Sequence, residues 1–151
     1  MTEPATETEL QLEDLAVDAP RVGIVMGSKS DMAAMESAAK ELTERGILHE
    51  TRVMSAHRDP DTVAEYAKNA RMRSLQVIIA GAGLAAALPG VVAAHTDLPV
   101  IGVPLTSSTS VAGGLDALLA ISQMPPGVPV ACVGVDNAKN AAVLAARILA
   151  V

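Results

Sequence analysis

The stretch MSAHRDPD, Met54–Asp61, places three side chains capable of chemistry within four residues. Ser55 supplies a hydroxyl donor, and Arg58 supplies a fixed cation that can hold a phosphate through two parallel hydrogen bonds. His57 lies between them, and an imidazole that titrates near neutral pH can accept and return a proton within one turnover. The grouping predicts a site that binds an anionic ligand and moves its protons. A histidine at a strand end can also be a hydrogen-bonded loop residue, and that alternative stays open.

A second stretch, GSKSD at 27–31, has the composition of an anion site at the start of a helix. Gly27 allows a tight turn, and the free backbone N–H groups of the first helical turn attract a phosphate together with the helix dipole. The Ser28 hydroxyl can add a donor. Alternatively, Ser30 or Asp31 serves only to cap the helix. The spacing differs from the Gly-x4-Gly-Lys-Ser/Thr phosphate loop, so any phosphate site here is of another kind.

The stretch GAGLAA at 81–86 matches the GxGxxG/A pattern of dinucleotide-binding loops, but it follows the third expected strand rather than the first. Asp97 comes too early to be the acidic residue that such loops need about 20 positions later. We expect these glycines to keep the floor of a ligand site free of side chains, so that a planar base can lie against the backbone. His49 and His95 have no comparable neighbours and no metal-ligand spacing, so no metal site is predicted.

Short β-branched runs alternate with longer Ala-rich runs from Arg21 onward, which is typical of βαβ units on a parallel sheet. Gly46 ends the first helix, Pro60 suits the first turn of the second, and Pro89 must kink or restart the third. The pattern predicts strands at 22–26, 49–54, 76–80, 99–103 and 130–135, and helices through about 45 and over 60–73, 84–95, 114–123 and 137–150.

Five apolar strands, each followed by a helix, predict an α/β fold with a doubly wound parallel sheet buried on both faces. In such sheets ligands bind beyond the carboxyl ends of the strands, where the strand order reverses. The clusters GSKSD, SAHRD, GAG and PLTSSTS each follow one of the first four strands. We therefore expect the ligand site at this edge of the sheet.

The formal net charge of −6 comes from residues 1–20, which hold six of the 17 acidic residues and no Lys or Arg. The remaining 21–151 balance 11 acidic against 11 basic residues, and a neutral body argues against nucleic acid or a membrane surface as a partner. We expect the acidic tail to be disordered or weakly helical. No run is long and apolar enough for a transmembrane helix, and the start lacks a signal peptide's basic residues, so we expect a cytoplasmic protein.

A length of 151 residues suits a single domain, and half of the residues are apolar although Tyr66 is the sole aromatic. The mean hydropathy of +0.37 is high for a domain of this size. We therefore expect part of the apolar surface to be covered in a homo-oligomer. Cys132 is the only cysteine, so no disulfide is expected, and we interpret it as a small buried hydrophobe.

Several long motifs together resemble the PurE family, the class I N5-carboxyaminoimidazole ribonucleotide mutases of purine biosynthesis, also named the catalytic subunit of phosphoribosylaminoimidazole carboxylase. The resemblance runs in order from about Arg21 to Val151 and leaves out only the acidic tail, so we expect one catalytic domain at 21–151. The motifs are VGIVMGSKSDM, VMSAHRDPD, QVIIAGAG, ALPGVVAAHTDLPVIGVP, GLDALLAISQMPPGVPVACV and DNAKNAAVLAARIL.

The resemblance implies a flavodoxin-like three-layer α/β/α sandwich, assembled as an octamer with active sites between subunits. It also implies a reaction that needs no ATP, metal or other cofactor. In that reaction the carboxylate on the exocyclic nitrogen of a small-molecule imidazole ribonucleotide moves to a ring carbon, through carbon dioxide held in the site.

The resemblance also implies a role for each matched residue. His57 would be the general acid and base that protonates the nitrogen and later removes the ring proton. The substrate-binding residues would be Ser28, Ser55 and Arg58 at the ribose phosphate, Asp31 at the ribose hydroxyls, Ala82 and Gly83 at the base and carboxylate, and Ala56 and Leu88 as further contacts.

One stretch departs from the family pattern. The family usually reads GAGGAAHLPG where this chain reads GAGLAAALPG, so Leu84 replaces a glycine and Ala87 replaces a second active-site histidine. The loss of that imidazole could slow the reaction or alter carbon dioxide handling, unless another donor such as Ser107 takes its place. Related carboxylases that use free carbon dioxide have a lysine after the motif histidine, so Arg58 favours the mutases.

Two alternatives to the mutase stay open. The first is a non-catalytic nucleotide-binding relative that kept the phosphate site and lost its chemistry with the histidine at position 87. The second is a carboxylase that acts on aminoimidazole ribonucleotide, or another heterocycle, with free carbon dioxide. Retention of His57 and Arg58 favours the mutase over both.

Overall fold

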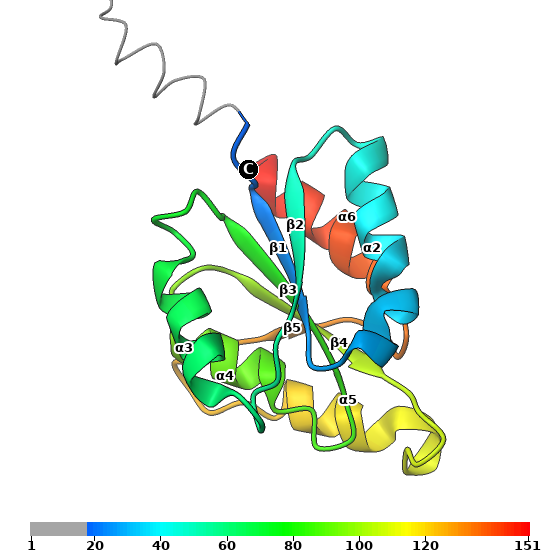
Figure 1. The fold of residues 1–151 in the computed structure, drawn as a ribbon. Helices are drawn as coiled ribbons and strands as arrows, with labels where there is room; N and C mark the ends of the chain where they lie inside the picture. Colours follow the sequence, from blue (N-terminus) through cyan, green and yellow to red (C-terminus); the bar gives the residue numbers. More distant parts are fainter. Residues whose placement is uncertain (1–17) are drawn as a thin grey trace, which may run out of the picture.

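The structure is a computed structural model that describes residues 18–151, and its centre is a five-stranded sheet (Figure 1). The predicted tail lies almost entirely outside the described residues. The strands are β1 (Val22–Met26), β2 (His49–Val53), β3 (Val77–Gly83), β4 (Val100–Leu105) and β5 (Ala131–Cys132). The helices are α2 (Met32–Glu44), α3 (Pro60–Asn69), α4 (Leu88–Ala94), α5 (Leu115–Ser122) and α6 (Ala138–Leu149), with short 3-10 turns at Lys29–Asp31 and Ala112–Gly114.

The strand order is β2-β1-β3-β4-β5, and all neighbouring strands are parallel. The chain therefore moves outward from β1 to β2, returns past β1 to β3, and continues in the other direction. This is the flavodoxin-like order, whose switch point lies between β1 and β3. The predicted doubly wound parallel sheet is confirmed.

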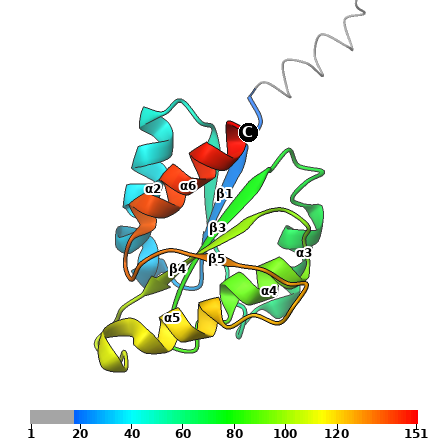
Figure 2. The same cartoon turned by 180° about the vertical axis from the view of Figure 1, so that it is seen from behind.

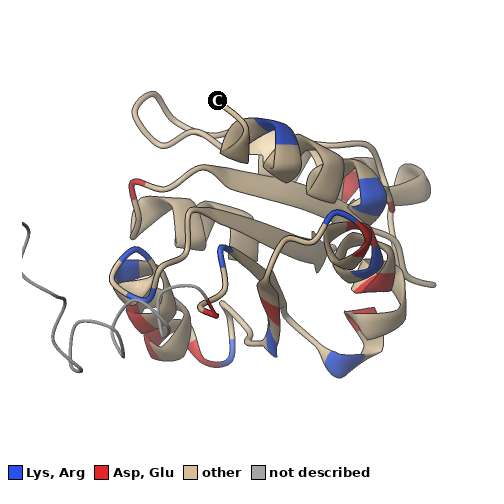
Figure 3. Cartoon of the chain, turned by 90° about the horizontal axis from the view of Figure 1, so that it is seen from above, with Lys and Arg blue, Asp and Glu red and all other residues tan. Residues whose placement is uncertain are grey.

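Helices cover both faces of the sheet, which confirms the predicted three layers (Figures 1 and 2). Helices α2 and α6 pack together over one core, in which Ile24, Ile79 and Val103 contribute from the strands. Helices α3, α4 and α5 cover the other core, with Val25, Ile78 and Val100. The strands β1, β3, β4 and β5 carry no charged residue, and the charges lie on helices, loops and the edge strand β2 (Figure 3).

Local signals explain where several helices begin and end. Pro60 opens α3, and the Asp59 carboxylate accepts a hydrogen bond from the Thr62 backbone N–H. Gly46, at φ 68°, follows α2 in the left-handed conformation that ends helices. These two predictions are confirmed. Helix α3 ends at Asn69 rather than near residue 73, because the chain continues in tight turns up to Ser74.

The predicted end of the third strand was wrong. Strand β3 continues through Gly83 instead of ending at residue 80, because its last residues pair with the end of β4, which itself reaches Leu105. A Cβ atom on Gly83 would lie 2.8 Å from the Leu105 carbonyl oxygen. Glycine therefore permits this close approach of the two backbones.

The predicted start of the third helix was also wrong. Helix α4 begins at Leu88 rather than at residue 84, because Leu84 and Ala86 have positive φ angles of 57° and 39°, which a right-handed helix excludes. Pro89 therefore lies in the first turn of α4, where its missing N–H costs nothing, and the helix begins there instead of being kinked or restarted.

The last strand is shorter than the predicted 130–135. Only Ala131 and Cys132 form β5, because their pairing with β4 is limited to two positions at the sheet edge. Cys132 is half-buried, so the expectation of a buried side chain was wrong. Among residues 18–151, no helix is long and apolar enough to cross a bilayer.

Candidate active site

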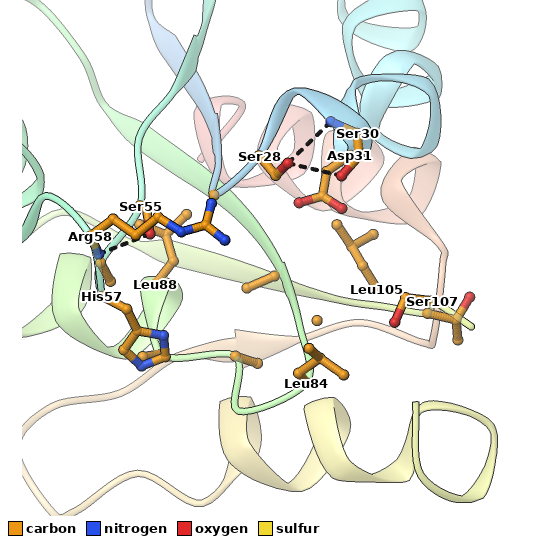
Figure 4. Close-up of a pocket in the computed structure, with 17 residues that line it drawn as sticks. Ser28, Ser30, Asp31, Ser55, His57, Arg58, Leu84, Leu88, Leu105 and Ser107 are labelled. Carbon is orange, nitrogen blue, oxygen red and sulfur yellow. Dashed lines mark hydrogen bonds between the residues drawn. The ribbon is translucent and has the colours of Figure 1, made fainter. Parts of the chain in front are cut away.

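A cavity of about 400 Å³ opens at the carboxyl ends of the strands, beside the switch point of the sheet. Loops after β1, β2, β3 and β4 line it, as predicted from the four polar clusters. It contains all nine residues expected to form the site (Figure 4): Ser28, Asp31, Ser55, Ala56, His57, Arg58, Ala82, Gly83 and Leu88. The residues singled out from the sequence therefore lie together around one cavity, and the role of each stays a prediction.

The turn after β1 brings three polar side chains to one side of the cavity. The Ser28 hydroxyl accepts a hydrogen bond from the Ser30 backbone N–H at 3.3 Å and lies 2.9 Å from the Ser30 hydroxyl. Asp31 precedes α2 but its side chain makes no capping hydrogen bond. Capping by Ser30 or Asp31, the alternative reading of this turn, is therefore wrong. The Asp31 carboxylate lies at the cavity near Ser28 (Figure 4).

Partial burial raises the pKa of the Asp31 carboxyl above its ordinary value of 3.8, and a weaker backbone interaction with Ser28 opposes the rise. Water is replaced at this position by the cavity wall, which disfavours the charged form. A ligand that donates hydroxyl hydrogen bonds would restore the lost solvation. Asp31 is therefore suited to bind neutral donors such as the hydroxyls of a ribose.

The loop after β2 holds the histidine and the arginine in a tight turn. The Ser55 hydroxyl accepts a hydrogen bond from the Arg58 backbone N–H at 3.1 Å, and the Ser55 carbonyl accepts one from Asp59 at 2.9 Å. The Arg58 guanidinium extends across the pocket toward Ser28, whereas the His57 ring points toward the Leu84 side (Figure 4). None of the ion pairs among the described residues involves Arg58, so its charge is available for an anionic ligand.

The floor of the cavity consists of backbone and small side chains. Ala82 and Gly83 form the end of β3, Ala56 lies in the loop after β2, and Leu88 begins α4. Of the two glycines expected to form this floor, Gly83 lines the cavity and Gly81 does not, because a Cβ atom on Gly81 would meet the Met35 side chain in the core. Among residues 18–151, no three His, Cys, Asp or Glu side chains are grouped closely enough to hold a metal ion.

The cavity also includes residues that sequence reasoning did not assign to it. Leu105, Thr106 and Ser107 enter because β4 extends further than predicted, although the hydroxyl-rich cluster after this strand and Ser107 as a donor were noted. The remaining lining residues are Gly27 and Ser30 of the GSKSD stretch, Ala86, and Leu84 and Ala87, at which the chain departs from the family pattern.

The strand order and the polar cavity at the switch point define a flavodoxin-like α/β protein with a small-molecule site. Residues 21–151 match the family model described as AIR carboxylase, and the chain belongs to this family.

Named relatives and a solved structure agree with this assignment. The chain is 60% identical over 132 residues to the N5-carboxyaminoimidazole ribonucleotide mutase of Thermotoga maritima, which covers 87% of this chain and 76% of that protein. It is 55% identical over 134 residues to the phosphoribosylaminoimidazole carboxylase of Schizosaccharomyces pombe, covering 89% of this chain and 24% of that protein. The crystal structure of Treponema denticola PurE is similar with a TM-score of 0.75 and 36% identity, covering 87% of this chain and 80% of that one.

Proposed function

We propose that this protein is an enzyme of purine biosynthesis that converts N5-carboxyaminoimidazole ribonucleotide to 4-carboxy-5-aminoimidazole ribonucleotide. The observation that carries the proposal is the cavity that holds His57 beside Arg58, in a chain 60% identical to a protein named as this mutase. An imidazole and a guanidinium at one site are the groups that a phosphorylated substrate with a proton-dependent carboxyl transfer requires.

The substrate binds with its phosphate at the polar side of the cavity. Ser28, Ser55 and Arg58 hold the phosphate, since the Arg58 guanidinium extends toward Ser28 and has no carboxylate partner among the described residues. Asp31 accepts hydrogen bonds from the ribose hydroxyls. The imidazole lies on Ala82 and Gly83, where no long side chain intrudes, and Ala56 and Leu88 complete the contacts.

His57 moves one proton in each direction during the reaction. The bond between the exocyclic nitrogen and the carboxylate carbon breaks, the electron pair stays on nitrogen, and that nitrogen takes a proton from the His57 imidazolium while carbon dioxide is released. The ring carbon then attacks the carbon dioxide, and the ring proton passes back to His57. The histidine ends as it began, so the isomerisation needs no ATP, metal or other cofactor.

A carboxylase that combines aminoimidazole ribonucleotide with free carbon dioxide is the second candidate. The 55% identity to a protein named phosphoribosylaminoimidazole carboxylase favours it. The source of the carboxyl carbon separates the two functions, because a mutase transfers the carbon already on the substrate.

We also propose the setting in which the enzyme works. The catalytic unit comprises residues 21–151, the assembly is a homo-octamer, and the enzyme acts in the cytoplasm without nucleic acid or membrane partners. The balanced charge of residues 21–151 and the exposed apolar side chains on α5 support these expectations.

The proposal is tested with substrate labelled with carbon-13 in its carboxylate, in unlabelled bicarbonate buffer. We expect the wild type to form a product that keeps the label, and His57→Ala to reduce kcat by at least about 100-fold, the range for loss of a general acid–base group. His95→Ala, at a histidine outside the cavity, is the matched control and should keep wild-type activity.

Each other outcome identifies a different function. An unlabelled product formed only from aminoimidazole ribonucleotide and bicarbonate would indicate the carboxylase. No product from either substrate, with ribonucleotide binding retained, would indicate a non-catalytic relative.

A further inference from the structure

The two sides of the cavity differ in polarity. The loops after β1 and β2 supply Asp31, His57, Arg58 and three of the four serines that line the cavity. The opposite wall, from the ends of β3 and β4 and the start of α4, is lined by Leu84, Ala86, Ala87, Leu88 and Leu105. On that wall, the polar side chains among the described residues are the hydroxyls of Thr106 and Ser107. Figure 4 shows Ser107 across the pocket from His57 and Arg58.

Asp136 holds the start of this hydroxyl-bearing loop from the neighbouring β5–α6 connection. One carboxylate oxygen accepts a hydrogen bond from the Thr106 backbone N–H at 2.9 Å, and the other accepts one from the Thr106 hydroxyl. The Asp136 backbone N–H in turn donates to the Pro104 carbonyl at 2.8 Å. Asp136 adopts φ 56°, a left-handed conformation that aspartate tolerates better than most residues. Three hydrogen bonds therefore fix the chain just before Ser107.

The Ser107 hydroxyl can still form a hydrogen bond to a ligand. Its backbone N–H donates to the Ser110 hydroxyl at 2.8 Å, which closes the loop. Among the described residues, its own hydroxyl has one hydrogen-bonding neighbour, the Thr109 hydroxyl at 3.3 Å. A serine hydroxyl has one donor and two acceptor positions, so at least one position can face the cavity.

We infer that Ser107 is a further substrate-binding residue, which donates a hydrogen bond to the carboxylate-bearing head of the substrate, and that Asp136 is the positioning residue that holds it there. The inference rests on the proposed function. With the phosphate at Arg58, the imidazole and its carboxylate extend toward the opposite wall. A carboxylate there needs a donor, and Leu84, Ala87 and Leu105 have none.

The first experiment compares two ligands that differ only in the head group. Ser107→Ala should lower kcat/KM for N5-carboxyaminoimidazole ribonucleotide about tenfold, the effect of losing one hydrogen bond to a charged group. Its affinity for ribose 5-phosphate, which has no imidazole or carboxylate, should match that of the wild type in an NMR titration. Ser122→Ala removes an exposed hydroxyl on α5 outside the cavity and should change neither quantity.

The second experiment tests Asp136 through Ser107. Asp136→Ala should lower kcat/KM about as much as Ser107→Ala and leave ribose 5-phosphate affinity intact. Asp136→Asn should restore activity, because the amide can accept from the Thr106 N–H and donate to its hydroxyl. The kcat/KM of the double variant should be about the same as that of either single variant, since both substitutions remove the same contact between Ser107 and the substrate. Asp97→Ala, at an exposed aspartate that pairs with Arg71 outside the cavity, is the control.

The outcomes separate this inference from the proposed function. Wild-type activity in Ser107→Ala, or an equal loss of ribose 5-phosphate affinity, would overturn the inference and leave the mutase standing. Additive losses in the double variant would overturn the positioning role of Asp136. If the wild type converts no substrate, the proposed function fails first and the inference fails with it.

Discussion

Position 87 is a place where one side chain can add a polar group to the apolar wall of the cavity. Ala87 lines the cavity with a methyl group at the start of α4, and its backbone is helical at φ −73°. A larger side chain at this position can extend into the cavity without a change of backbone conformation. A histidine here, as the family pattern in the sequence analysis has it, would give this wall an imidazole donor that Ala87 lacks.

We predict that Ala87→His raises kcat/KM for the mutase reaction about tenfold, because the imidazole adds a hydrogen bond to the substrate carboxylate. Steady-state kinetics of the purified variant provide the measurement. Ala85→His is the matched control, since Ala85 is exposed and does not line the cavity. Equal or lower activity in Ala87→His would mean that the existing wall, including Ser107, already serves the substrate head.

At the scale of single elements, the pattern of apolar runs predicted five strands and five helices in the right order. Strand β1 and helix α6 lie within one residue of their expected bounds. The predicted strand ends are wrong where tertiary contacts determine how far a strand extends. Strand β3 continues past its expected end because Gly83 allows close packing against Leu105. Strand β5 ends early because it pairs with β4 alone, at two positions. Such contacts leave no periodic signal in the sequence.

The meeting of the predicted residues around one cavity was foreseeable for a related reason. Ser28, His57 and Arg58 are polar residues at strand ends, and a parallel sheet brings those ends together. Thr106 and Asp136 were not predicted, because their contact joins two loops that are 30 residues apart. Neither loop alone indicates that partner.

The loop between β3 and α4 contains backbone strain that glycine would relieve. Leu84 has φ 57°, in the left-handed region that costs a residue with a side chain about 1–2 kcal/mol. We predict that Leu84→Gly is more stable than Leu84→Ala by about 0.5–1 kcal/mol, because both remove the half-exposed side chain and only glycine relieves the backbone. Urea unfolding of the two variants measures this difference. If Leu84→Ala is at least as stable as Leu84→Gly, the backbone at position 84 is not strained.

Strand β2 is attached to α3 and the turn beyond it by a polar cluster around Glu50. The Glu50 carboxylate accepts hydrogen bonds from the Tyr66 hydroxyl at 2.9 Å, from Arg73 at 2.7 Å and from Arg52 at 3.2 Å. Both guanidinium carbons lie 5.6 Å from the centre of the Tyr66 ring, within the range of a cation–π interaction. Burial raises the pKa of Glu50, but the hydrogen bonds and charges of its partners outweigh it and hold the pKa below the ordinary 4.5.

We predict that this cluster makes folding stability depend on pH. A carboxyl with a lowered pKa in the folded state stabilises the fold above its unfolded pKa of about 4.5, and this contribution is lost as the pH falls through the lower folded value. Glu50→Gln should therefore be less stable than wild type at pH 7, with the difference shrinking below pH 4.5. The raised pKa of Asp31 gives stability the opposite dependence on pH. Asp31 is present in both proteins, so the difference in stability between Glu50→Gln and wild type reports on Glu50.

Urea unfolding midpoints between pH 3 and pH 7 provide the measurement, and Glu44→Gln, at an exposed glutamate on α2, is the control. A constant difference between Glu50→Gln and wild type across this range would show that the Glu50 charge does not contribute.

At the scale of the whole molecule, several large apolar side chains of the described residues are exposed. Leu115 and Leu119 on α5 are 45% and 46% exposed, and Val111 just before the helix is 65% exposed. Residues four apart share one face of a helix, so these leucines form an apolar stripe. Helix α5 follows the loop of Ser107, which joins this stripe to the edge of the cavity (Figure 4).

We predict that the protein assembles through this stripe and that its activity depends on the assembly. Light scattering of the purified wild type should give eight times the mass of one chain. Leu119→Glu should shift the mass to smaller species, because a charge cannot be buried there without a partner. Its kcat/KM should fall about tenfold or more, since the loop that carries Ser107 would lose the packing of the neighbouring subunit. Asn140→Glu, which adds the same charge to an exposed position of α6, should change neither mass nor activity. Dissociation of Leu119→Glu with full activity would show that one subunit contains the complete site. An unchanged mass would show that the subunits contact each other through a surface other than α5.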